Sequence, residues 1–130
     1  MMNKVCHFEI PTEDRDRAKK FCAEVFGWRT EDMPFQNKVY TFAITTPEDE
    51  QFMYIEKGGI NGGMFNKEAP LQSPVVTIEV PSIDEHIAKI EAAGGKLLLP
   101  KGEVPDMGWY AYFRDTEGNV MGLWENIPKA

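Results

Sequence analysis

One short motif occurs twice in the sequence and decides the fold. It reads His-Phe-Glu-Ile-Pro at His7–Pro11 and Thr-Ile-Glu-Val-Pro at Thr77–Pro81. Each copy alternates polar and apolar side chains as a half-buried β-strand does, and each ends in a proline just before a helical pattern. A motif that recurs in this way indicates two similar structural units within one chain.

An amphipathic helix is expected after each copy of the motif. The first covers Asp14–Phe26 and is followed by Gly27, a common helix stop. The second covers Ser82–Ala93, where Ser82 and Glu85 form a capping box. The apolar residues that the first helix presents at helical spacing are Ala18, Phe21, Cys22, Val25 and Phe26.

Runs rich in β-branched and aromatic residues predict three strands after each helix. These strands are Val39–Thr46, Phe52–Ile55 and Ile60–Phe65 in the first half, and Lys96–Leu99, Trp109–Arg114 and Val120–Glu125 in the second. Val39–Thr46 and Phe52–Ile55 are expected to form a hairpin. Two βαβββ modules follow, at about residues 3–66 and 74–127, which we expect to pair as one domain around a shared cavity.

Composition limits the classes of function. The chain has 130 residues, enough for one domain, and 21 acidic against 14 basic residues give a net charge of -7. This charge repels a phosphate backbone and an anionic membrane surface, so we expect neither nucleic acid nor membrane as a partner. Cys6 and Cys22 form no metal or disulfide motif, and no signal segment is recognised, which favours a cytoplasmic location.

Three further patterns extend the motif along the chain. They are His7, Ile10, Thr12, Asp14 and Phe21 in the first strand and helix; Phe26-Gly27-Trp28; and the turn Asp115-Thr116-Glu117-Gly118-Asn119. Together they resemble the vicinal oxygen chelate superfamily, which contains glyoxalase I, extradiol dioxygenases and bleomycin-resistance proteins. The resemblance implies an α+β fold in which two βαβββ modules form a curved eight-stranded mixed sheet. It also implies a homodimer.

The resemblance further implies a divalent metal, such as Zn, Ni, Mn or Fe, held by side chains from the first and last strand of each module. His7 falls on the first of these positions, where a neutral imidazole suits such ions. The positions that match the other three ligands are Val75 or Thr77, Gly62 or Gly63, and Gly122. Glycine has no side chain to coordinate a metal, so the resemblance implies the fold more firmly than the metal chemistry.

Carboxylates and aromatic residues supply the remaining candidates. Glu9 and Glu79 share the strand parity of His7 and Thr77, so they are candidate catalytic groups; the alternative is that they pair with nearby Lys or Arg at the strand ends. Glu56 is a candidate replacement metal ligand. The candidate ligand-binding residues are His7, Thr77, Tyr40, Trp109, Tyr112 and Trp124, although aromatic residues in so small a chain are often core.

Three functions are compatible with these residues. The first is a glyoxalase-like protein that binds a small organic molecule and lacks most of the usual metal ligands. The second is a divalent-metal-dependent lyase or isomerase of glyoxalase type that uses His7 and substitute carboxylates. The third is resistance-type sequestration of a cationic compound. Whether the protein is an enzyme stays open at this point.

Overall fold

The structure is a computed structural model that describes residues 2–46 and 58–128. The chain divides into two compact units. The first unit is His7–Pro74, and the second combines Met1–Cys6 with Val75–Ala130. Within the described residues, no helix has the length and apolar character needed to cross a membrane.

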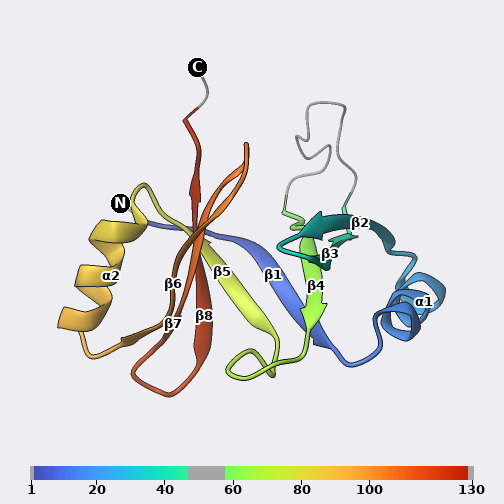
Figure 1. The fold of residues 1–130 in the computed structure, drawn as a ribbon, viewed down its shortest axis with the longest axis horizontal. Helices are drawn as coiled ribbons and strands as arrows, with labels where there is room; N and C mark the ends of the chain where they lie inside the picture. Colours follow the sequence, from blue (N-terminus) through green and yellow to red (C-terminus); the bar gives the residue numbers. More distant parts are fainter. Residues whose placement is uncertain (1, 47–57, 129–130) are drawn as a thin grey trace. The chain divides into compact units, whose positions relative to one another are not determined.

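In its described residues, 7–46 and 58–74, the first unit contains four strands and one helix (Figure 1). In chain order these are β1 (Val5–Thr12), α1 (Arg15–Phe26), β2 (Arg29–Phe35), β3 (Lys38–Ile44) and β4 (Gly62–Asn66). The strands lie in the order β2-β3-β4-β1. β1 and β4 run parallel, whereas β3 is antiparallel to both β2 and β4.

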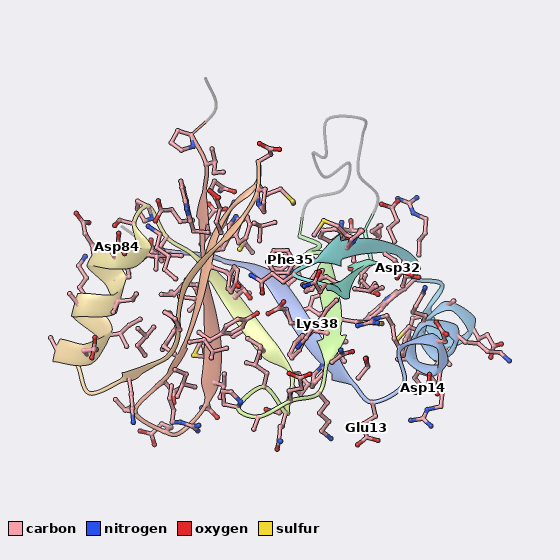
Figure 2. The ribbon with its side chains drawn as sticks, viewed as in Figure 1. Glu13, Asp14, Asp32, Phe35, Lys38 and Asp84 are labelled. Atoms are coloured by element: carbon pink, nitrogen blue, oxygen red, sulfur yellow. The ribbon has the colours of Figure 1, made fainter. Side chains whose placement is uncertain are left out.

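Helix α1 begins and ends where the sequence predicts. The Asp14 side chain, labelled in Figure 2, accepts a hydrogen bond from the Arg17 backbone N–H at 3.0 Å and caps the helix. Gly27 ends it in the left-handed conformation, with φ of 71°. The helix packs on the sheet through Cys22 and Ala18, which join a core with Met64 and Ala43.

The predicted apolar face of α1 is only partly correct. Phe21, Val25 and Phe26 are 58%, 55% and 60% exposed, although the helical spacing groups them with Ala18 and Cys22. The reason is geometric, because small residues at two positions already fill the contact between the helix and the sheet.

Strand β2 was not predicted. It pairs antiparallel with β3, so the partner of β3 in the hairpin is Arg29–Phe35. The strand is difficult to predict from the sequence because it lies at the edge of the unit's sheet and carries charged residues. It also contains Pro34, which is tolerated on edge strands. The strand expected at Phe52–Ile55 falls outside the described residues.

The second unit repeats the same plan (Figure 1). Its elements are β5 (Val75–Glu79), α2 (Ile83–Ala92), β6 (Lys96–Val104), β7 (Gly108–Arg114) and β8 (Val120–Asn126). The strand order is β5-β8-β7-β6, with β5 and β8 parallel. Ser82 caps α2 as the sequence predicts, by accepting a hydrogen bond from the Glu85 N–H at 3.2 Å. Ile83, Ala111 and Leu123 form the centre of a core beneath the helix.

The predicted fold class is therefore confirmed. The described residues form eight strands in mixed parallel and antiparallel pairing, with one helix after the first strand of each module, and so give the βαβββ order twice.

Candidate functional site

The first unit's sheet has two chemically different faces. Strand alternation places Phe8 on the face that packs against α1, so His7 and Glu9 lie on the opposite face. Strand β4 is in parallel register with β1, with Phe8 opposite Gly62 and Glu9 opposite Gly63. The candidate site is the face that carries His7 and Glu9.

Tyr40, from β3, links these two residues. Its hydroxyl donates a hydrogen bond to Glu9 Oε2 at 2.7 Å, and the same oxygen lies 3.0 Å from His7 Nε2. A phenol has a single hydroxyl proton, and here it points at Glu9. The contact between His7 Nε2 and the Tyr40 oxygen is a second hydrogen bond, whose donor depends on the imidazole tautomer. Glu9 is only 6% exposed, so this network provides a buried carboxylate with a donor.

Gly63 lets Tyr40 reach both partners. Strand β3 is antiparallel to β4 with Phe42 opposite Gly63, and the Tyr40 ring leans over this glycine. A Cβ at position 63 would overlap the Tyr40 hydroxyl and ring. The glycine is therefore required by the packing of the tyrosine, and no residue with a side chain fits there while Tyr40 keeps this position.

Burial sets the charge state of His7. It lowers the pKa of the imidazole below its ordinary value, against smaller opposite effects from the Glu9 charge and from a backbone hydrogen bond with Asn61. A lowered pKa favours the neutral ring at neutral pH. Burial therefore favours a neutral His7 that is hydrogen-bonded to Tyr40 through Nε2.

The metal-ligand positions implied by the resemblance can be compared with these contacts. In the second unit Thr77 lies opposite Gly122, and a Cβ on Gly122 would come 2.9 Å from Thr77 Oγ1. Continuing the register of β1 and β4 by one residue places Asn61 opposite His7. The counterpart of Gly122 in the first unit is thus Asn61, one residue before the expected Gly62 or Gly63.

Asn61 is also engaged elsewhere. Its side-chain oxygen accepts hydrogen bonds from the backbone N–H groups of Thr45 and Thr46, at 2.8 and 2.9 Å. Residues 2–46 and 58–128 contain no group of three or more His, Cys, Asp or Glu side chains placed to hold a metal ion. The residues at the implied positions do not fit a four-ligand metal centre, since His7 Nε2 is hydrogen-bonded to Tyr40 and Gly122 offers no donor.

The second unit holds a related arrangement. Trp124 donates through Nε1 to Asn126 Oδ1 at 2.8 Å, and the Asn126 amide donates to Glu79 Oε1 at 3.1 Å. The Trp124 ring lies over Gly108, where a Cβ would approach its Cζ2 to 2.6 Å. In each unit, therefore, an aromatic residue crosses over a glycine of the neighbouring strand and connects to the carboxylate of the first strand.

The other predicted site residues divide between the faces. Tyr112 lies opposite Gly122, and Thr77 is buried beside the same glycine. Trp109 packs against the core beneath α2 and lies under the Lys101 ammonium group, whose nitrogen is 5.1 Å from the ring centre. Glu56 falls outside the described residues. Figure 2 shows the side chains of both units.

Sequence reasoning missed Tyr110 in this part of the chain. Tyr110 pairs with Trp124 across β7 and β8 and shares a face with Tyr112, 6.0 Å from it by ring centres. Glu125 accepts a hydrogen bond from the Ile83 N–H at 2.8 Å and so helps to cap α2. The segment Pro105–Trp109 contains the tight turn between β6 and β7.

Glu79 also borders a hollow in the second unit. This hollow has a volume of about 350 Å³ and is lined in addition by the N-terminal residues, Val80, Pro81, Glu125 and Asn126. Lys4 contributes to the same lining, so the hollow presents charges of both signs.

Comparison with known proteins agrees with this architecture. The family model described as "Bleomycin resistance protein-like N-terminal" matches residues 4–41. A Mycobacterium tuberculosis protein, CFP32, whose name gives it provisionally as a glyoxylase, is 26% identical over 119 residues. That match covers 90% of this chain but 43% of the relative, so the chain spans less than half of that protein's length. A glyoxylase-like domain-containing protein of Didymella fabae is 28% identical over 125 residues, with 92% of this chain and 91% of that protein covered.

Solved structures share the fold across the whole chain. A hypothetical protein of Bacillus halodurans superimposes with a TM-score of 0.68 at 17% identity and covers 100% of this chain and 99% of its own. A variant of methylmalonyl-CoA epimerase from Streptomyces coelicolor, in complex with 2-nitronate-propionyl-CoA, gives a TM-score of 0.71 at 10% identity over 98% of this chain and 100% of its own. These matches support the resemblance of the chain to glyoxalase-like and bleomycin-resistance-like proteins of the vicinal oxygen chelate superfamily.

Proposed function

We propose that this protein binds a small organic molecule and does so without the four-ligand metal centre that its superfamily resemblance implies. The observation that carries the proposal is the bridge formed by Tyr40 between His7 and Glu9. The two polar groups nearest the expected metal position are directed at a tyrosine hydroxyl, and the packing at Gly63 holds that tyrosine in place.

Aromatic pairs supply the physical basis for binding. On the site face of the first unit, the Tyr40 and Phe42 rings meet edge to face with centres 5.4 Å apart. In the second unit, Tyr110 and Tyr112 form a similar pair on the face away from α2. Rings of this kind provide flat apolar surface with a polar edge, which suits a planar organic molecule that carries one or two hydrogen-bonding groups.

Ligand-observed NMR tests the proposal on protein dialysed against EDTA. The probes are three planar molecules, namely phenol, indole and quinoline. We expect saturation transfer to at least one of them, weakened in Phe42→Ala and unchanged in Val39→Ala, since Val39 precedes Tyr40 but is 41% exposed. Transfer that appears only after addition of Zn²⁺ or Ni²⁺, or an absence of transfer to all three, would contradict the proposal.

A metal-dependent lyase or isomerase is the second candidate, favoured by the glyoxylase names of the relatives. It requires His7 and Glu9 to leave Tyr40 and a further ligand to join them. Turnover of the hemithioacetal of methylglyoxal and glutathione, abolished by EDTA and by His7→Ala, would support it over our proposal.

Homodimer formation stays a prediction. The exposed apolar residues of α1, Phe21, Val25 and Phe26, are the positions to mutate when sedimentation measures the oligomeric state.

A further inference from the structure

The Tyr40 hydroxyl lies between His7 and Glu9 and is hydrogen-bonded to both side chains. We propose that the Tyr40 hydroxyl occupies the place a divalent cation would take between these two side chains, so that this one residue determines the metal independence of the first unit. The inference rests on the proposed function and names the residue responsible for its most distinctive property.

Distances support the substitution of an oxygen for an ion. His7 Nε2 and Glu9 Oε2 converge on one atom, the Tyr40 oxygen, at 3.0 and 2.7 Å. Bonds from zinc to histidine nitrogen and carboxylate oxygen are about 2.1 Å, so the two ligands need to close by only about 0.9 and 0.6 Å around an ion at that point. Rotation of a histidine and a glutamate side chain is sufficient for such movements.

Hydrogen bonding explains how the hydroxyl excludes a metal. A histidine nitrogen binds a metal through its lone pair, and Nε2 is in hydrogen-bond contact with the Tyr40 oxygen at 3.0 Å. Glu9, in turn, accepts the tyrosine proton. Tyr40 thus engages a nitrogen of His7 and an acceptor site of Glu9. A cation would have to displace both hydrogen bonds before it could bind.

Space is the second requirement, and it is also controlled by Tyr40. Gly63 lies beneath the tyrosine ring and has no side chain of its own. Removal of the ring therefore opens room beside His7 and Glu9 for a cation that keeps water in its remaining coordination positions. With Tyr40 in place, that room is filled.

Cobalt and zinc titrations test the inference directly. The proteins are the wild type, Tyr40→Ala, the double variant His7→Ala/Tyr40→Ala, and Phe42→Ala as the matched control, which loses a neighbouring ring on the same face but keeps the hydroxyl. Calorimetry with Zn²⁺ measures the affinity, and the visible absorption of Co²⁺ reports the ligands.

We expect Tyr40→Ala to bind one equivalent of metal at least about tenfold more tightly than the wild type, a gain of about 1.4 kcal/mol. Phe42→Ala should behave as the wild type, and the double variant should lose the gain. Equal affinity in Tyr40→Ala and wild type would overturn the inference, as would a gain that persists without His7.

A second variant guards against a folding defect. Tyr40→Phe keeps the ring and removes only the hydroxyl, so near-UV circular dichroism should remain native while metal affinity rises at least about threefold. No rise in a folded Tyr40→Phe would also overturn the inference. The two proposals fail in different ways. Stoichiometric metal binding by the wild type through His7 would contradict the proposed function. A metal-free wild type whose Tyr40 variants gain no metal affinity would contradict only the inference about Tyr40.

Discussion

Loss of the Tyr40 hydroxyl should destabilise the protein measurably. In Tyr40→Phe the carboxylate of Glu9, 6% exposed, loses a donor at 2.7 Å, and His7 loses a hydrogen-bond partner at 3.0 Å. A hydrogen bond to a charged group contributes about 1.5–3 kcal/mol and a neutral one about 0.5–1.5 kcal/mol. We therefore expect the free energy of unfolding to fall by about 2–4 kcal/mol, and the melting temperature by roughly 6–15 °C for a chain of this size.

Urea denaturation followed by tryptophan fluorescence, at pH 7, measures the change. Val39→Ala is the control, and because Val39 is 41% exposed its effect should stay within about 0.5 kcal/mol. A double-mutant cycle of Tyr40→Phe with Glu9→Gln should give a coupling of at least about 1 kcal/mol. A Tyr40→Phe protein within about 0.5 kcal/mol of the wild type, or additive effects in the cycle, would show that the network contributes little to stability and would refute the reasoning.

Three more predictions follow from the described contacts. Gly63→Ala should lose about 1–3 kcal/mol of unfolding free energy because its Cβ overlaps the Tyr40 ring, and the loss should shrink in a Tyr40→Ala background; equal losses in both backgrounds would contradict this. Because burial lowers the pKa of His7, the folded protein binds that proton less readily than the unfolded chain. The His7 contribution to stability is therefore complete above the ordinary pKa of about 6.5 and is lost as the pH falls below it, so His7→Asn should flatten the decline between about pH 7 and pH 5 in denaturation curves. Burial, and to a smaller extent the charge of Glu79, raises the pKa of Cys6 from 9.0 to about 11. Native Cys6 should therefore react with iodoacetamide at pH 8 about 100-fold more slowly than Cys6 in urea, as measured by mass spectrometry. Equal rates would contradict the burial of Cys6.

Local signals were enough to predict most of the fold. The capping residues Asp14 and Ser82 act as the sequence indicates, and the repeated motif marks the first strand of each module. These features depend on residues near one another in the chain. β2 escaped prediction because an edge strand with charges and Pro34 lacks the apolar alternation of a buried strand.

The candidate site was predicted residue by residue, but its connections were not. His7, Glu9 and Tyr40 were each candidates, yet their contact depends on the register of β3, β4 and β1 and on the space above Gly63. The register between strands that are distant in the sequence cannot be predicted from a local residue pattern.

Strand parity could have improved the prediction in the second unit. Trp109 and Tyr112 are three residues apart on β7, so they cannot share a face of a regular strand, whereas Tyr110 and Tyr112 can. Applied consistently, this rule would have placed Trp109 with the core beneath α2 and added Tyr110 to the candidates.

Elemental analysis tests the central claim most directly, namely that hydrogen bonds through Tyr40 stand where a metal centre would be expected. The protein would be purified without a metal-affinity tag from cells grown with added zinc, nickel, manganese and iron, beside His7→Ala as the matched control. The account predicts that neither protein retains a stoichiometric metal after dialysis. One equivalent of a transition metal in the wild type that is lost in His7→Ala would contradict it.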